Sequence, residues 1–218
     1  MPTSRSYRDA CGIARALDVV GERWALLVIR ELLLGPQRFS DLRLALPNAS
    51  SNVLADRLRE LEGNGVLHRR KLSPPAASSV YELTESGREL EPIVLALGEW
   101  GVRVALPTTP TTLSATSVLL FLRASARPDP EGATSVCRFE LNDRAWSVRT
   151  EAGQVHVQAG EPLEPDVSLR TDPETLNALL EDPGKLDVVV SDGSVTVAGD
   201  CSALRRLLAT VEDRASAR

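Results

Sequence analysis

The sequence predicts an α+β fold in two domains: an N-terminal winged helix-turn-helix domain and a C-terminal α+β domain with an antiparallel sheet. Three observations support this prediction. Residues 40–84 read as helix, tight turn, second helix and basic β-hairpin. Residues 107–112, Pro-Thr-Thr-Pro-Thr-Thr, are typical of a stiff polar linker. Beyond them, apolar residues alternate with period two, as in strands with one buried face. The predicted domains are therefore residues 1–106 and 113–218.

The N-terminal domain is predicted to contain five helices and one hairpin. Ser40 is expected to cap the first helix of the helix-turn-helix motif, and Ser50 the second. The hairpin surrounds Pro74-Pro75. Pro92 is expected to kink or split the last helix. In chain order, the predicted elements are helices over 9–20, 25–34, 41–46 and 50–62, strands over 66–72 and 79–83, and a helix over 85–105.

The helix predicted over residues 85–105 is amphipathic and requires a partner surface on its apolar side. Because it lies outside the compact winged domain, we interpret that surface as a dimer interface as well as a lid on the core. A core helix without a role in dimerisation is the alternative. The residues assigned to dimerisation are Leu90, Ile93, Leu97 and Trp100.

The C-terminal domain shows strand patterns on both sides of one well-marked helix. Asp172 is expected to cap that helix, with Pro173 at its first position. A final helix is expected to open at Gly199-Asp200. The residues of 114–125 fit either a buried strand or a helix, because their apolar run is short. The predicted strands cover 137–141, 146–148, 155–157, 167–169, 188–190 and 194–198.

Composition and charge exclude several classes of protein. The net charge is −5, which is not that of a general nucleic-acid binder. Residues 1–105 hold 14 Lys and Arg against 13 Asp and Glu, whereas residues 106–218 hold 11 against 17. Any contact with DNA must therefore depend on local clusters such as residues 69–71. No apolar run approaches the roughly 18 residues of a membrane span, and the N-terminus lacks the apolar region of a secretory signal.

The cysteines and histidines indicate a cytoplasmic protein without a metal site or cofactor. Three scattered cysteines argue against a disulfide framework. His68 and His156 are far apart in sequence, with no Cys or His at ligand spacing. No Gly-x-Ser-x-Gly, phosphate-loop or His-Glu-x-x-His motif is present. Asp166 and Asp172 could form an acid pair but are better interpreted as strand-end and helix-cap residues, so we expect no enzymatic activity.

The second helix of the motif is the predicted DNA-recognition helix. Its leucines mark the buried side, so Asn52, Asp56 and Arg59 are expected to point outward. Asn52 is suited to adenine and Arg59 to guanine or phosphate, while Arg57 is a candidate phosphate anchor. For both arginines, pairing with acidic neighbours on a solvated face is the alternative. The full set of predicted DNA-binding residues is Ser40, Ser50, Ser51, Asn52, Asp56, Arg57, Arg59, Arg69, Arg70 and Lys71.

The basic residues of the hairpin leave one choice open. Successive strand residues face opposite sides, so either Arg69 and Lys71 face DNA together or Arg70 does so alone. The expected target is a pseudo-palindromic operator in double-stranded DNA, bound by a homodimer.

A set of short motifs is spread over residues 7–104, at 11–13, 16–21, 23–24, 30–32, 39–42, 58–61, Gly65, 81–84 and Gly87. Through these motifs, this part of the chain resembles the HxlR-type winged-helix regulators. The resemblance implies a homodimeric transcriptional regulator of inverted-repeat operators, with a sensing cysteine often found where Cys11 stands. Two features depart from the family pattern: Asn52 and Asp56 stand where a basic and an uncharged residue are common, and the wing tip, 74–79, lacks a basic residue.

The C-terminal half is similar to the sterol-carrier-protein fold, through residues 165–180 and 192–200. This resemblance implies an apolar tunnel for a small hydrophobic effector and favours a helix over 114–125. Two alternatives remain: a purely structural C-terminal domain, or a lipid carrier whose winged half no longer binds DNA. The candidate lining residues, each equally suited to a plain core, are Phe121, Phe139, Trp146, Val148, Leu169 and Val197.

Cys11 is the candidate redox residue, because a helix N-terminus favours the thiolate. A bond between the two copies of Cys11 in a dimer is one hypothesis, and a packed or idle thiol is the other. Cys137 is expected in the core, and Cys201 at the start of the last helix with partial exposure.

Overall fold

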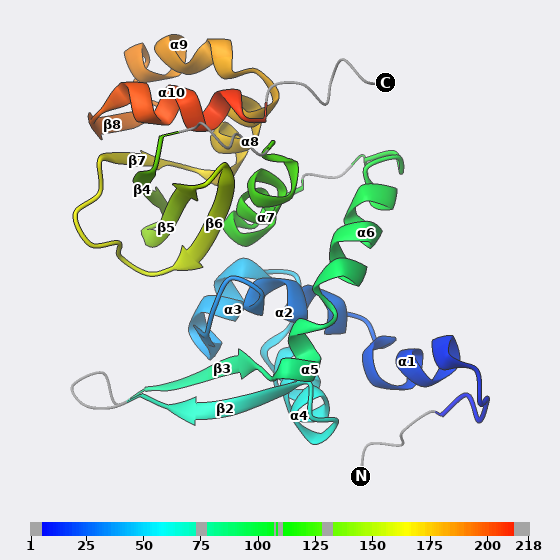
Figure 1. The fold of residues 1–218 in the computed structure, drawn as a ribbon. Coiled ribbons are helices and arrows are strands. Elements are labelled where there is room, and N and C mark those ends of the chain that lie inside the picture. Colours follow the sequence, from blue (N-terminus) through cyan, green and yellow to red (C-terminus); the bar gives the residue numbers. More distant parts are fainter. Residues whose placement is uncertain (1–5, 73–77, 107, 109–110, 128–132, 212–218) are drawn as a thin grey trace. The chain divides into compact units, whose positions relative to one another are not determined.

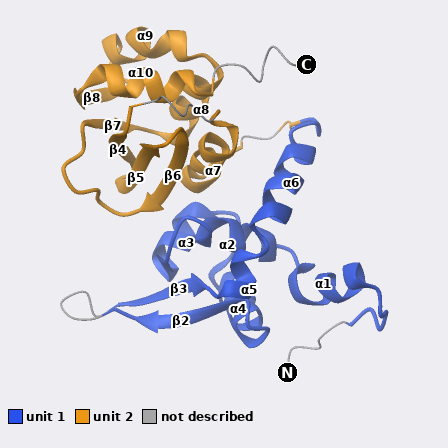
Figure 2. Cartoon of the chain, viewed as in Figure 1, with its two compact units in different colours: residues 1–105 blue, residues 106–218 orange. Residues whose placement is uncertain are grey.

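The computed structural model describes residues 6–72, 78–106, 108, 111–127 and 133–211. The chain divides into two compact units, residues 1–105 (unit 1) and 106–218 (unit 2), coloured blue and orange in Figure 2. The predicted α+β class is confirmed. Each unit has its own core and is described by itself.

Unit 1 is a winged helix-turn-helix fold (Figure 1). Its three strands form an antiparallel sheet in the order β1-β3-β2. The strand β1 was not predicted, because its two residues are too few to show a period. The elements are α1 (Gly12–Val20), α2 (Ala25–Leu32), β1 (Gln37–Arg38), α3 (Phe39–Ala45), α4 (Ser51–Gly63), β2 (Leu67–Lys71), β3 (Ser79–Leu83), α5 (Glu85–Arg88) and α6 (Glu91–Gly101).

The caps of α3 and α4 differ in how well the sequence predicted them. Ser50 caps α4 as expected, since its Oγ accepts from the Val53 N–H at 3.3 Å. Ser40 does not cap α3, and that prediction was wrong. Because β1 leads directly into the helix, Arg38 occupies the N-cap, and its N–H donates to Asp41 Oδ2 at 3.0 Å. Ser40 therefore lies inside the first turn.

The predicted helix over 85–105 is split, as the position of Pro92 indicated. The helix is interrupted between α5 and α6. Pro92 stands in the first turn of α6, where backbone N–H groups have no partner within the helix, so the missing N–H of proline removes no hydrogen bond. Leu90 and Val94 pack against the core of unit 1, so α6 does cover that core. That core is built mainly by the buried faces of α2, α3 and α4.

Unit 2 is a five-stranded sheet with helices on one face. The strand order is β6-β5-β4-β7-β8. Along the chain, its elements are α7 (Ala115–Ser125), β4 (Ser135–Leu141), β5 (Arg144–Glu151), β6 (Gln154–Ala159), β7 (Val167–Thr171), α8 (Pro173–Glu181), a 3₁₀ turn (Pro183–Lys185), α9 (Leu186–Ser191), β8 (Thr196–Gly199) and α10 (Cys201–Ala209).

The sheet of unit 2 is mostly antiparallel, as predicted, and within it β4 and β7 pair in parallel. After β6 the chain crosses back over the sheet, so β7 joins β4 on the side away from β5 and runs in the same direction. A pattern of alternation reports which face a residue occupies and carries no information on strand direction.

Three helices of unit 2 test the sequence assignments. The ambiguous segment is a helix, α7, capped by Ser114. Asp172 caps α8 with Pro173 at its first position, as predicted. The strand predicted over 188–190 is wrong, because these residues lie within α9. Their β-branched side chains favour strands only weakly, and the 3₁₀ turn that precedes them continues directly into a helix.

The core of unit 2 lies between the sheet and its helices. α7 packs against β6, and α10 packs against β4 and β7. Alternate residues of β4 are buried on this face, while the opposite face carries polar and charged side chains. Cys137 is fully buried here, as expected.

Candidate nucleic-acid interface

The helix α4 presents one apolar and one polar side. Leu54, Leu58 and Leu61 are 0–1% exposed and anchor the helix in the core of unit 1. Ser51 and Asn52 are exposed at its first turn, where backbone N–H groups without helical partners favour an anion. The predicted division of the helix between core and solvent is therefore present.

Arg59 does not stand alone on the polar side. Its guanidinium forms an ion pair with Asp56, one turn earlier, and the two side chains are 69% and 49% exposed. The acidic residue is thus partly neutralised, as is the cation that would contact DNA. The alternative of an acidic partner is realised, although the partner is Asp56 rather than Glu62.

Arg57 lies closer to the core than the other polar residues of α4. Its side chain is 15% exposed and pairs with Glu60. Its Nη1 also lies 3.9 Å from Glu22, in the segment between α1 and α2. Arg57 therefore ties α4 to the chain after α1, which is a structural role that the spacing in α4 did not predict.

The two faces of β2 carry different basic residues. Arg69 and Lys71 share one face, and the Arg69 guanidinium lies over the Tyr81 ring at 6.0 Å from its centroid. Arg70 points to the other face, where its Nε lies 3.1 Å from Glu82 Oε2. The wing tip falls largely outside the described residues, at 73–77.

Glu82 gathers two arginines and a histidine, a cluster that the sequence analysis did not predict. Besides Arg70, Arg88 lies 3.3 Å from its carboxylate and His68 lies 3.8 Å away. The register of β2 on β3, which sets His68 opposite Glu82, is the signal that could have revealed this cluster. Charge on this face of the wing is therefore partly compensated within unit 1.

The helices α1 and α6 expose apolar side chains. On α6, Ile93, Leu97 and Trp100 are 56%, 48% and 61% exposed, whereas Leu90 packs on the core. On α1, Ile13 is 73% exposed, and Val20 is the residue of that helix that is buried. These faces are apolar surfaces that the fold of unit 1 leaves open to solvent.

The candidate effector residues of unit 2 lie in its packed core. Those on the inner face of the sheet are Phe139, Trp146, Val148 and Leu169, all 0–1% exposed. Phe121 and Val197 are half-buried. The structure thus brings these side chains into one layer, filled by their own packing.

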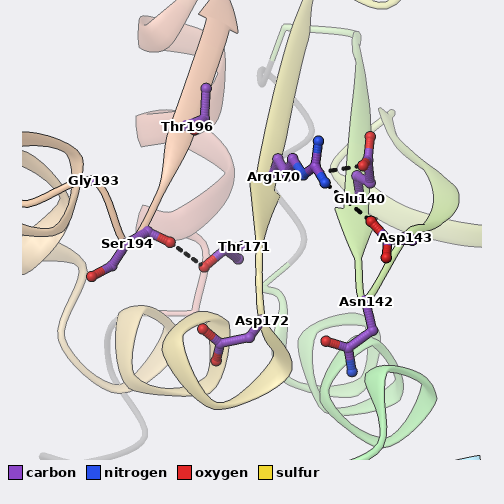
Figure 3. A pocket seen from close by; sticks show the side chains of 9 residues that line it. All are labelled: Glu140, Asn142, Asp143, Arg170, Thr171, Asp172, Gly193, Ser194 and Thr196. Carbon is purple, nitrogen blue, oxygen red and sulfur yellow. Dashed lines mark hydrogen bonds and ion pairs between the residues drawn. The ribbon is translucent and has the colours of Figure 1, made fainter. Parts of the chain in front are cut away.

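A cavity of about 340 Å³ lies elsewhere in unit 2, at one end of the sheet (Figure 3). Its walls are polar and come from β4, β7, β8 and the turns beside them. Arg170 bridges Glu140 and Asp143 at 3.2 and 3.0 Å, and the Thr171 hydroxyl donates to the Ser194 carbonyl at 2.9 Å. These residues are far apart in sequence and meet only through strand pairing, so no local pattern revealed the cavity.

The three cysteines occupy different environments. Cys11 is exposed at the N-cap of α1, where its N–H donates to Asp9 Oδ1 at 2.8 Å. Cys201 begins α10 and is half-buried. Burial raises the pKa of the Cys137 thiol to about 11. Cys137 is therefore a neutral thiol at physiological pH, and the predictions for Cys137 and Cys201 are confirmed.

Neither a cluster of metal ligands nor a membrane-spanning helix is present in the described part of the chain. No group of three or more His, Cys, Asp or Glu side chains there could hold a metal ion. Within the same ranges, no helix has both the length and the apolar character needed to cross a bilayer.

Comparisons with known proteins match both halves of the chain. Residues 19–108 match the model described as HxlR-like helix-turn-helix, and residues 117–212 match that of the SCP-2 sterol transfer family. The uncharacterized HTH-type transcriptional regulator YvaP of Bacillus subtilis (strain 168) is 41% identical over 86 residues, which are 39% of this chain and 80% of that protein. YybR of the same organism, also named an uncharacterized HTH-type transcriptional regulator, is 37% identical over 94 residues, 43% of this chain and 75% of that protein.

A solved structure titled "Redox regulator HypR in its oxidized form" is also similar. It is 36% identical, with a TM-score of 0.42, and the match covers 44% of this chain and all of that one.

Proposed function

This chain belongs to the HxlR-like helix-turn-helix family of transcriptional regulators and carries an SCP-2-type second half, and we propose that it binds a pseudo-palindromic operator as a homodimer. The observation that carries this proposal is that α4 has one buried apolar side and one exposed polar side. Three leucines anchor the helix in the core, while its first turn and the side chain of Asn52 are open to solvent. A helix held in this way fits the major groove of B-DNA.

Within this proposal, the DNA contacts divide into phosphate and base contacts. Ser50 and Ser51 offer a helix N-terminus to a phosphate, and Asn52 reads a base edge. Ser40 contributes from the first turn of α3, and Lys71 from the wing. The proposed interface also includes Asp56, Arg57, Arg59, Arg69 and Arg70. Within it, Asp56 and Arg59 form an ion pair with each other.

Dimerisation is proposed through α6, with Ile93, Leu97 and Trp100 covered by a second copy of the chain. Leu90 supports α6 from the core side. The support is the exposure of these apolar side chains, which water solvates poorly. Two copies then place two α4 helices on successive major grooves, about 10 base pairs apart or a multiple of that.

A gel-shift titration on the DNA upstream of the gene tests the proposal. The full chain is expected to bind a two-half-site duplex tightly and a single half-site weakly. Equal affinity for both duplexes would contradict the dimer model. Sedimentation at the same concentrations reports the oligomeric state independently.

For unit 2 we propose a small hydrophobic effector, which makes residues 113–218 a sensor joined by 107–112 to a DNA-binding half at 1–106. The support is the match to a sterol transfer family and an apolar inner face containing Trp146. An effector alters DNA binding only if it binds one dimer geometry more tightly than another. A purely structural unit 2 and a lipid carrier are the competing proposals. DNA binding in the gel shift whose affinity is unchanged by apolar ligands would favour the structural role.

Redox control through Cys11 is the second proposed route of regulation. The support is that Cys11 is exposed and stands at the N-cap of α1, whose Ile13 is open to solvent. Non-reducing electrophoresis after mild peroxide tests it, and a covalent dimer absent from Cys11→Ser is expected. Because the named relatives are transcriptional regulators, we propose no catalytic role; cytoplasmic localisation is part of the same proposal.

A further inference from the structure

Val53 is an exposed apolar side chain on α4. It is 37% exposed and is not among the residues that build the core of unit 1. Successive residues of an α-helix are turned by about 100° around its axis. Val53 therefore lies between the buried side of the helix, marked by Leu54, and the open side, marked by Asn52. It stands at the border of the surface that α4 presents to solvent.

Neither helix propensity nor the core of unit 1 accounts for a valine at this position. A β-branched side chain loses rotamer freedom in a helix, so Val forms helices less readily than Ala. The exposed part of the Val53 side chain also contributes no burial of apolar surface to the fold. An apolar group that meets α4 from outside unit 1 would account for it.

The position of Val53 along α4 indicates what that group is. Val53 is the third residue of the helix, and its N–H donates to Ser50 Oγ at 3.3 Å within the N-terminal cap. In helix-turn-helix proteins, the N-terminal residues of the recognition helix contact base edges. One turn later on the same stripe of α4, the side chain of Arg57 is 15% exposed and pairs with Glu60. Val53 is thus the more open of the two, at the end of the helix nearest the bases.

The major groove offers an apolar group that matches this side chain. Among the base edges displayed there, thymine carries a C5-methyl group, whereas the other groups are hydrogen-bond donors and acceptors. An isopropyl side chain has no polar atom with which to meet a donor or an acceptor. The neighbouring residue, Asn52, carries an amide suited to adenine. An amide followed by an apolar side chain therefore fits adjacent A·T base pairs.

We propose that Val53 is a specificity-determining residue that contacts the C5-methyl group of a thymine, beside the base contacted by Asn52. This inference rests on the DNA-binding role proposed above and adds one base position to each half-site. The contact selects thymine over cytosine, because cytosine lacks the methyl group and presents an amine that the apolar side chain leaves without an acceptor.

Uracil in place of thymine tests the contact, because it removes the methyl group and keeps every hydrogen-bonding group of the base. Fluorescence anisotropy is measured with the full chain on an operator selected from random duplexes, each thymine being replaced in turn by uracil. One position is expected to lose about four-fold in affinity per half-site, as for one buried methyl group. Tight operator binding without such a position would overturn the thymine contact and leave the DNA-binding role. Selection of no operator at all would remove both.

Variants of α4 assign the contact to its residue. Val53→Ala and Val53→Ser both remove the two methyl groups, and each is expected to bind the thymine and uracil operators equally at that position. The matched control is Leu44→Ala, which removes an apolar side chain that is 78% exposed on α3 and is expected to retain the four-fold difference. Thermal melts identify the variants that are folded. An unchanged four-fold loss in either folded Val53 variant would refute the assignment.

Discussion

The guanidinium of Arg59 is paired with the carboxylate of Asp56, one helical turn away on α4. The pair sits on the polar side of a helix that three leucines hold in the core, so it belongs to the surface proposed to face DNA. An exposed ion pair of this kind contributes little to stability. Its main consequence is electrostatic, because a negative charge beside phosphates opposes binding.

Asp56→Asn is expected to tighten DNA binding by several-fold on all sequences and to steepen its dependence on salt. The substitution removes a repulsive charge and releases Arg59 for a phosphate. Fluorescence anisotropy across a salt series measures both quantities. Glu60→Gln, on the same helix but paired with Arg57, is the control, and a similar gain there would show a general charge effect instead.

Asn52→Ala is expected to relax preference at one operator position, at a cost of about 1–3 kcal/mol for the preferred base. Asn is suited to a bidentate contact with adenine, and Ala has no polar group to replace it. Competition gel shifts with each base substituted in turn identify the position. A uniform loss across all duplexes would instead assign Asn52 to the backbone.

The wing allows its two faces to be compared directly. Lys71→Ala is expected to lower the slope of log affinity against log salt by about 1, as for one lost phosphate contact. Arg70→Ala is expected to change the slope less, because Glu82 already holds that guanidinium at 3.1 Å. The reverse order of effects would place the Arg70 face of the wing against DNA.

Leu97→Glu is expected to convert the dimer to a monomer and to weaken operator binding by at least about 100-fold. A charge buried in an apolar interface must lose its hydration, and the free energy this costs exceeds the free energy that one contact contributes. Sedimentation velocity measures the oligomeric state. Leu163→Glu, an exposed leucine of unit 2, is the control, and a stable dimer in Leu97→Glu would exclude this face of α6.

Cys137 is expected to resist alkylation at pH 8 in the native protein, while Cys11 reacts. Burial raises the pKa of the Cys137 thiol to about 11, whereas in the unfolded chain the thiol ionises near its ordinary value, about 8.5. The folded state therefore holds this proton more tightly, and the contribution of Cys137 to stability declines as pH rises from about 9 toward 11. Mass spectrometry after iodoacetamide and urea melts of Cys137→Ala check both points.

The sequence was sufficient to predict features that depend on contacts between residues close together in the chain. Ser50 and Asp172 cap helices because their side chains reach an N–H three residues ahead, and that geometry depends on spacing alone. The break beside Pro92 and the burial of the α4 leucines follow for the same reason. The predicted cap at Ser40 was wrong because the short strand β1, which the sequence did not reveal, leads directly into α3 and makes Arg38 the N-cap.

The sequence predicted less well those features that depend on residues far apart in the chain. The residues of α9 have a strand-like composition, yet the turn before them starts a helix. The parallel pairing of β4 with β7 depends on where the chain crosses the sheet, which alternation does not record. Glu82 contacts Arg70, Arg88 and His68, and Arg57 approaches Glu22, only because folding brought those segments together.

The amino-acid sequence alone determined the two-domain order, the helix-turn-helix, the caps at Ser50 and Asp172 and the apolar faces, because periodicity and capping are properties of neighbouring residues. The tertiary structure decided which charges are already paired, which face of the wing each arginine occupies, and that the buried Trp146 Nε1–H finds no acceptor among the residues that the structure describes. Those properties depend on distances between residues remote in the chain, which are defined only once the backbone has folded.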